Sequence, residues 1–221
     1  MRTLPLTPAE YRNALYIDFE GEGKKKDGTV PRPHMMGLFR PNPTRKSGKY
    51  TCVFFSPLWK VVANHFQKIA VIEDFADYFE NLSLELNETK QHLVFWSVHE
   101  EMILRKFLPK KIFERLAPRL HNLHPIARRY ATRRRAFGEN ETAKGKTLKE
   151  FFEVVYQTRY PYPPFPLGAA NACRRIDKAC TRHNRWKKFT VKQQSYTDAL
   201  VEYNSGDCAS TWLIAKRLGA L

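Results

Sequence analysis

The chain has 221 residues, of which 43% are apolar, and a formal net charge of +16. This length and apolar content fit one large domain, residues 1–221, with its own buried core. No apolar run approaches the roughly 20 residues of a membrane-spanning helix, and the first residues lack the apolar segment of a secretory signal. We therefore expect a cytoplasmic protein without a membrane partner, whose four scattered cysteines stay free thiols.

The N-terminal part of the chain predicts three strands. Residues 13–20 alternate in the manner of a strand, which places Asp18 and Glu20 on the same face. Residues 34–40 and 49–56 have the composition of two further strands, joined by a Pro- and Gly-containing turn. Together these segments predict a three-stranded antiparallel meander.

The middle of the chain predicts helices around a buried strand. Residues 61–88 carry an apolar stripe at helical spacing and are expected to be helical in two pieces. Residues 92–97, with the apolar run Leu93-Val94-Phe95-Trp96, predict a short buried strand, and residues 99–108 predict a helix. A strand, helix, strand order with an apolar second strand predicts an α/β fold with a mixed sheet.

The C-terminal half predicts mainly helix. Residues 109–135 are basic and interrupted by prolines, so we expect a basic helical insertion at about 105–146 that ends in a loop at 136–146. Thr147 and Glu150 form the pattern of a capping box. The segments that follow are expected to be an extended Tyr- and Pro-rich stretch at 160–166 and helices at 169–188 and 191–218.

Four acidic residues lie inside or beside apolar segments. Asp18 and Glu20 end the first strand, Glu100 follows the buried strand, and Asp207 lies within a mainly apolar helical stripe. Glu101 is an alternative to Glu100. Acids in such positions are unfavourable unless a partner compensates their charge. Divalent cations are the partners expected where several carboxylates converge.

These residues resemble a known family in their order along the chain: Asp-x-Glu on a first strand, an acid after a later strand, and Tyr-x-x-x-Asp on a final helix. They resemble the DEDD (DnaQ-like) 3′–5′ exonucleases of the ribonuclease-H-like superfamily, over nearly the whole chain. The resemblance implies an α/β fold with a ribonuclease-H-like mixed β-sheet flanked by α-helices. The positions matched to the family motifs are Asp18, Glu20, Glu100, Tyr203 and Asp207.

The resemblance also implies a two-metal-ion phosphodiesterase with Mg²⁺ or Mn²⁺ as its cofactor. Asp18 would bridge two ions, and Glu20, Glu100 and Asp207 would complete their oxygen shells. Tyr203 would hydrogen-bond the attacking water. The resulting prediction is a metal-dependent 3′–5′ exonuclease.

The chain departs from the family pattern in two ways. Its second motif has Glu where most members carry Asp, which is similar to the YprB-type predicted nucleases, as is the final Tyr-Asn-x-x-Asp. About 100 residues separate the second and third motifs, more than in compact members. Two alternatives therefore stay open. One is a nucleic-acid-binding module with a degenerate nuclease site, and the other is a structure-specific endonuclease.

The positive charge is concentrated in two segments. Residues 105–135 hold 11 Lys and Arg against one Glu, and residues 172–193 hold 8 against one Asp. Basic blocks are typical of proteins that bind polyanions, with a solvated basic surface as the alternative. We expect nucleic acid, DNA or RNA, as the partner, and no small-molecule cofactor. The predicted contacts are Lys24, Lys25, Arg128, Arg129, Arg133, Arg134, Arg135, Arg182 and Lys187.

Overall fold

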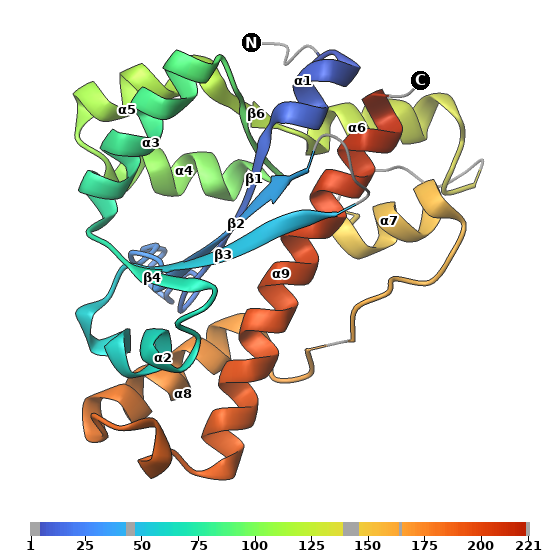
Figure 1. Ribbon diagram of the computed structural model, residues 1–221. Helices are drawn as coiled ribbons and strands as arrows, with labels where there is room; N and C mark the ends of the chain where they lie inside the picture. Colours follow the sequence, from blue (N-terminus) through green and yellow to red (C-terminus); the bar gives the residue numbers. More distant parts are fainter. Residues whose placement is uncertain (1–4, 43–46, 139–145, 164, 220–221) are drawn as a thin grey trace.

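The computed structural model describes residues 5–42, 47–138, 146–163 and 165–219 (Figure 1). Within these ranges, six strands form one sheet in the order β4-β3-β2-β1-β5-β6. β2 is antiparallel to β1 and β3, whereas the other neighbouring pairs are parallel. The strands are β1 (Leu15–Glu20), β2 (Met35–Pro41), β3 (Gly48–Phe54), β4 (Ala70–Ile72), β5 (Leu93–Phe95) and β6 (Leu120–Asn122).

Helices cover both faces of this sheet, so the predicted α/β class with a mixed, helix-flanked sheet is confirmed (Figure 1). One face is covered by α3 (Phe75–Thr89), α4 (Val98–Phe107) and α5 (Lys110–Leu116). The long helix α9 (Val191–Gly219) crosses the other face. The remaining α-helices are α1 (Pro8–Asn13), α2 (Lys60–His65), α6 (His124–Arg133), α7 (Leu148–Tyr156) and α8 (Ala169–Arg182), with short 3₁₀ turns at Pro57–Trp59, Ala117–Arg119 and Trp186–Lys188.

The alternation of β1 decides which side chains face α9. Leu15, Ile17 and Phe19 belong to the core cluster beneath α3, α4 and α5. Tyr16 belongs to the opposite cluster, which includes residues of α9. Because successive side chains of a strand point to opposite faces, Asp18 lies on the α9 side with Tyr16.

Gly37 allows α9 to pack closely against the sheet at this point. It is the β2 partner of Asp18. A Cβ at Gly37 would collide with the Asn204 side chain and would lie 2.8 Å from Cys208 Sγ. The missing side chain thus leaves the space in which α9 meets the end of β1.

Two short strands were not predicted. Ala70–Ile72, inside the expected helical segment, forms β4 and pairs with β3. Leu120–Asn122, inside the segment expected to be a helical insertion, forms β6 and pairs with β5. The insertion is therefore partly an edge of the sheet. Strands of three residues are stabilised by partners distant in sequence, so local patterns do not reveal them.

Other local predictions are confirmed. The meander of β1, β2 and β3 is antiparallel, and the Thr147–Glu150 capping box begins α7. The four cysteines are free and buried. In the expected loop at 136–146, residues 139–145 lie outside the described residues, as do residues 43–46 of the turn expected from the sequence. No helix in the described ranges has the length and apolar character needed to cross a membrane.

Candidate metal centre

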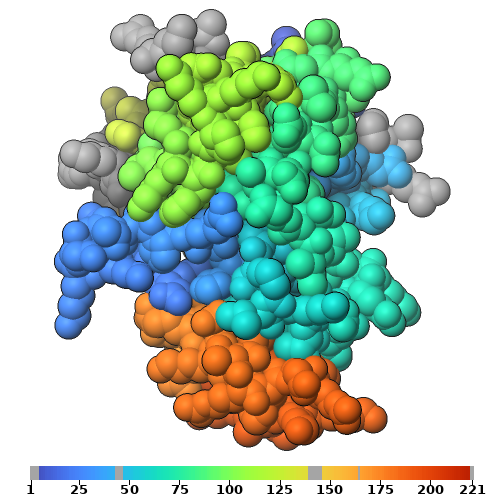
Figure 2. Space-filling model, turned by 90° about the vertical axis from the view of Figure 1, so that its left-hand side faces the viewer, coloured from blue at the N-terminus to red at the C-terminus, as the bar shows by residue number. Residues whose placement is uncertain are grey.

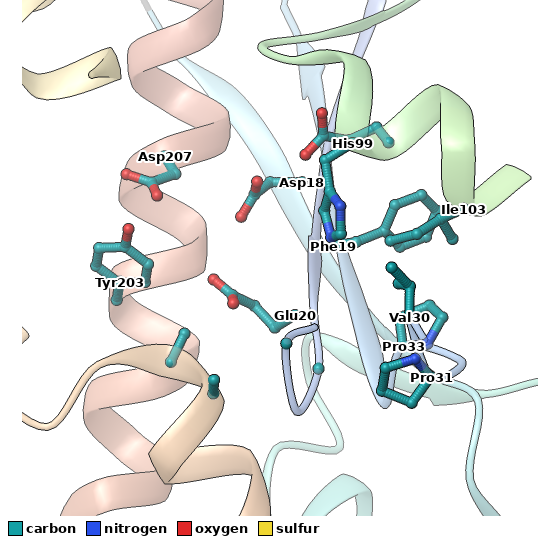
Figure 3. Close-up of a pocket in the computed structure, with 15 residues that line it drawn as sticks. Asp18, Phe19, Glu20, Val30, Pro31, Pro33, His99, Ile103, Tyr203 and Asp207 are labelled. Atoms are coloured by element: carbon teal, nitrogen blue, oxygen red, sulfur yellow. The ribbon is translucent and has the colours of Figure 1, made fainter. Parts of the chain in front are cut away.

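Three carboxylates converge between β1 and α9. Asp18 and Glu20 come from the C-terminal end of β1, and Asp207 comes from the middle of α9. One oxygen from each lies within 4.8 Å of the others, and no other group of this kind occurs among the described residues. Figure 3 shows Asp18 and Glu20 directed from β1 toward α9, which carries Asp207. This geometry brings together Asp18 and Asp207, which are 189 residues apart along the chain.

The surroundings of these carboxylates disfavour their negative charge. Burial, and then repulsion by Glu20 and Asp207, raise the pKa of Asp18 well above its ordinary value. Burial and repulsion by Asp207 raise the pKa of Glu20 to about 8. Burial also raises the pKa of Asp207. Without a cation, these shifts favour the protonated carboxyl groups, and a divalent cation would compete with the protons.

Glu100 lies in the same cavity but is bound differently. It is only 5% exposed, and its charge adds to the repulsion on Asp18. Its Oε2 accepts hydrogen bonds from Ser97 N at 3.0 Å and Ser97 Oγ at 2.9 Å, which closes the capping box of α4. It is not part of the three-carboxylate group. The alternative residue, Glu101, pairs with Arg105 at 2.9 Å and does not line the cavity.

Asn204 holds Asp18 from α9. Its Nδ2 donates to Asp18 Oδ2 at 2.8 Å and to Asp18 O at 3.1 Å. Tyr50 Oη donates to Asn204 Oδ1 at 2.8 Å, so the amide has a partner on each side. Sequence reasoning missed this role. The available signal was a polar residue on the buried side of α9, next to Tyr203.

Two tyrosines flank Asp207. Tyr203, one turn earlier on α9, lines the cavity, and burial together with the Asp207 charge raises its pKa. Tyr160 Oη donates to Asp207 Oδ1 at 2.7 Å. Tyr160 lies in the segment between α7 and α8, and no spacing in the sequence connects it to Asp207, so it was not predicted. Both phenols stay protonated and can act as hydrogen-bond donors.

The cavity beside the carboxylates has a volume of about 300 Å³. Acids and Tyr203 form one side, and apolar side chains form much of the other (Figure 3). His99 lies between them, and burial lowers its pKa, which favours a neutral imidazole. The apolar lining consists of Phe19, Val30, Pro31, Pro33, Ile103, Ala169 and Ala170.

Lys24 and Lys25 are exposed on the loop that follows β1. Gly21 and Gly23 of the same loop line the cavity. Figure 2 shows this blue segment projecting from the surface between the green helices and the orange α8. Of the basic residues predicted to bind nucleic acid, these two are the ones whose loop forms part of the cavity wall.

The other predicted basic contacts lie away from the carboxylates. α6 and α8 are located toward opposite ends of α9 (Figure 1). Arg128, Arg129 and Arg133 line a separate hollow of about 460 Å³. The remaining predicted contacts are exposed, on or just after α6 and on the α8 side: Arg134, Arg135, Arg182 and Lys187.

Comparison of the chain with models of protein families, with curated proteins and with solved structures finds no match. The class of the molecule is therefore defined by its own fold and site. It is an α/β protein with a six-stranded mixed sheet and a cavity in which carboxylates from the first strand and the last helix meet.

Proposed function

We propose that this chain is a metal-dependent nuclease of ribonuclease-H-like fold that hydrolyses phosphodiester bonds. The observation that carries the proposal is the convergence of Asp18, Glu20 and Asp207 within 4.8 Å. The antiparallel meander and the mixed sheet around β1 support the ribonuclease-H-like assignment. The 3′–5′ exonuclease polarity follows from the motif resemblance.

The donor set fits Mg²⁺ or Mn²⁺. It consists only of carboxylate oxygens, which hard divalent cations prefer. When bound, a pair of such ions activates a water for attack on phosphorus and stabilises the leaving oxygen. Asp18, Glu20 and Asp207 would hold the ions, and Glu100 would extend the acidic wall. Tyr203 would donate a hydrogen bond that orients the attacking water.

The rest of the molecule supports a nucleic-acid substrate. The net charge of +16 favours association with a polyanion. The loop of Lys24 and Lys25 borders the cavity, where its ammonium groups would meet phosphates next to the scissile one. The apolar wall opposite the acids would accommodate the uncharged part of a nucleotide and exclude water from the reacting phosphate.

Glu100 favours one second candidate, a nucleic-acid-binding module with a degenerate nuclease site. Its carboxylate is engaged by Ser97 as a helix cap and lies outside the three-carboxylate group. A site with three effective ligands would bind substrate yet turn it over poorly.

The deciding experiment compares linear and circular single-stranded oligonucleotides of DNA and of RNA, incubated with the protein and Mn²⁺. A 5′-labelled linear substrate should give a ladder that shortens from the 3′ end, and the circle should stay intact. An EDTA arm should show no cleavage, and Asp18→Asn controls for a contaminating nuclease. Cutting of the circle would favour an endonuclease. Binding without cleavage would favour the degenerate module. Full cleavage in EDTA would exclude the metal mechanism.

A further inference from the structure

The connector between α7 and α8 runs along the part of α9 that carries the site. Tyr160 donates its hydroxyl proton to Asp207 Oδ1 at 2.7 Å. Tyr162 packs against Gly206, since a Cβ at that glycine would lie only 2.6 Å from the Tyr162 ring. The connector therefore approaches α9 closely at the last carboxylate and at the residue just before it.

A third contact continues this arrangement toward the start of α9. Phe165 packs against Tyr203, with ring centroids 5.6 Å apart. The connector thus meets α9 at positions 203, 206 and 207, which are neighbours on one helical face. The Tyr- and Pro-rich sequence of the connector suits this course, because proline restricts the backbone to extended conformations.

Tyr160 is itself held in place. Its ring meets Phe152 edge to face, with centroids 5.4 Å apart, and its backbone N donates to Glu153 Oε1 at 3.1 Å. Ser210 Oγ donates to the Tyr160 hydroxyl oxygen at 3.2 Å. Because a hydroxyl has one proton, this bond leaves the Tyr160 proton for Asp207.

We propose that Tyr160 is a positioning residue that presents Asp207 to a divalent cation. By donating to Oδ1, Tyr160 restrains the orientation of a carboxylate that converges with those of Asp18 and Glu20. This inference rests on the proposed function, because it requires Asp207 to be a metal ligand. Outer partners that orient ligands typically change metal affinity by about 10- to 100-fold when removed.

The test compares Tyr160→Phe with Tyr162→Phe in the full chain. Both variants keep the ring and lose one hydroxyl, but of these two hydroxyls the one that donates to a carboxylate in the described structure is that of Tyr160. Mn²⁺ affinity is measured by isothermal titration calorimetry, and folding by thermal unfolding in EDTA. Tyr160→Phe should weaken Mn²⁺ binding about 10-fold or more, whereas Tyr162→Phe should bind Mn²⁺ as the wild type does.

Nucleic-acid cleavage provides a second, separate measurement. If Tyr160 acts through metal binding, the activity of Tyr160→Phe should approach that of the wild type at saturating Mn²⁺. Three results would overturn the proposal. The Mn²⁺ affinity of Tyr160→Phe could be unchanged, or the Mn²⁺ affinity of both variants could fall equally. Saturating Mn²⁺ could also fail to restore the activity that Tyr160→Phe has lost. A wild-type chain that binds no Mn²⁺ would also overturn it. Mn²⁺ binding that depends on Tyr160, in a protein that cleaves no nucleic acid, would support the positioning role and refute the proposed nuclease alone.

Discussion

The acidic cavity and the basic ends of the molecule differ in how their charged side chains are held: the acids are buried or half-buried and hydrogen-bonded, and the basic side chains are exposed. In the cavity, a few carboxylates are fixed by named partners: Asn204 holds Asp18, Tyr160 holds Asp207, and Ser97 holds Glu100. At the ends of α9, many arginines and lysines are exposed on helix surfaces. Burial and mutual repulsion raise the pKa values of the acids. Each of these acids is thus held in one orientation by its hydrogen bonds, whereas the exposed cations together create a positive potential over a wide surface.

This difference has a functional consequence. If the proposed function holds, a single substitution in the cavity would remove a metal ligand. A single substitution on the basic surface would then remove one of many weak phosphate contacts, whose effects add and are screened by salt. Chemistry and affinity should therefore respond to different mutations and by very different amounts.

The largest effect is expected for Asp207→Asn. The amide keeps the shape of the side chain but removes a charge that a divalent cation would need, so cleavage should fall by about 1,000-fold or more. The apo protein should remain folded, and its stability should be equal or higher because one repelling group is gone. Cleavage rates and thermal unfolding in EDTA measure the two effects. Wild-type activity in this variant would show that Asp207 is no ligand and would remove the strongest motif match.

Glu100→Gln and Glu101→Gln form a matched pair for the second motif. Glutamine can still close the capping box at Ser97, so Glu100→Gln removes the charge and leaves the helix start intact. If Glu100 helps to hold metal, its activity should fall about 10- to 100-fold, in the range of lost electrostatic and positioning effects. Glu101→Gln should stay within about twofold, since Glu101 pairs with Arg105 outside the cavity. Equal activity of the two variants would identify Glu100 as a helix cap only.

The sequence predicted the acids because each one interrupts an otherwise apolar pattern. The alternation of β1 placed Asp18 and Glu20 on one face, and the helical stripe of α9 placed Asp207 inward. The structure brings these three side chains together, while their metal-binding role stays a prediction. Periodicity is a local property, which one strand or one helix is long enough to display.

What the sequence could not predict depends on contacts between distant segments. Tyr160 and Asp207 are 47 residues apart, and Tyr50 and Asn204 are 154 apart. Nothing local indicates either hydrogen bond. The strands Ala70–Ile72 and Leu120–Asn122 were missed for the same reason, since each exists only through a parallel neighbour.

A smaller effect is expected on the basic surface. The double variant Arg128→Gln, Arg133→Gln removes two exposed cations from one hollow on α6. If this end of the molecule binds the substrate, affinity should fall for every sequence. The slope of log K against log salt should decrease by about 0.7–0.9 for each lost phosphate contact.

The matched pair Arg182→Gln, Lys187→Gln tests the opposite end of α9. Binding is measured by fluorescence anisotropy at several salt concentrations, with cleavage at saturating substrate as a control that should not change. A reduced slope of log K against log salt in one double variant would show which end of the molecule the nucleic acid contacts. Reduced slopes in both double variants would indicate that the nucleic acid spans the molecule. Unchanged slopes in both pairs would mean that these blocks are solvated surfaces.

The last effect concerns stability rather than activity, in its dependence on pH without metal. Glu20 titrates near 4.5 in an unfolded chain and at about 8 in the folded protein. Between these values the folded state binds more protons than the unfolded state. The contribution of Glu20 to the free energy of unfolding therefore falls as pH rises from about 4.5 to 8, and it is constant above pH 8.

Thermal unfolding in EDTA at several pH values, for the wild type and Glu20→Gln, measures this contribution together with the change at Asp18, whose pKa Glu20 raises. The comparison of the wild type with Glu20→Gln is needed because other groups also make stability depend on pH. Burial lowers the pKa of His121 to about 4, so the contribution of His121 to stability rises with pH. Relative to Glu20→Gln, the wild type should lose stability as pH rises toward 8. Mn²⁺ should restore it at pH 8 and have little effect at pH 5, where protons compete for the carboxylates. Parallel pH profiles for the two proteins would show that Glu20 does not carry its proton into the neutral range, and that the cavity tolerates its full negative charge without a cation.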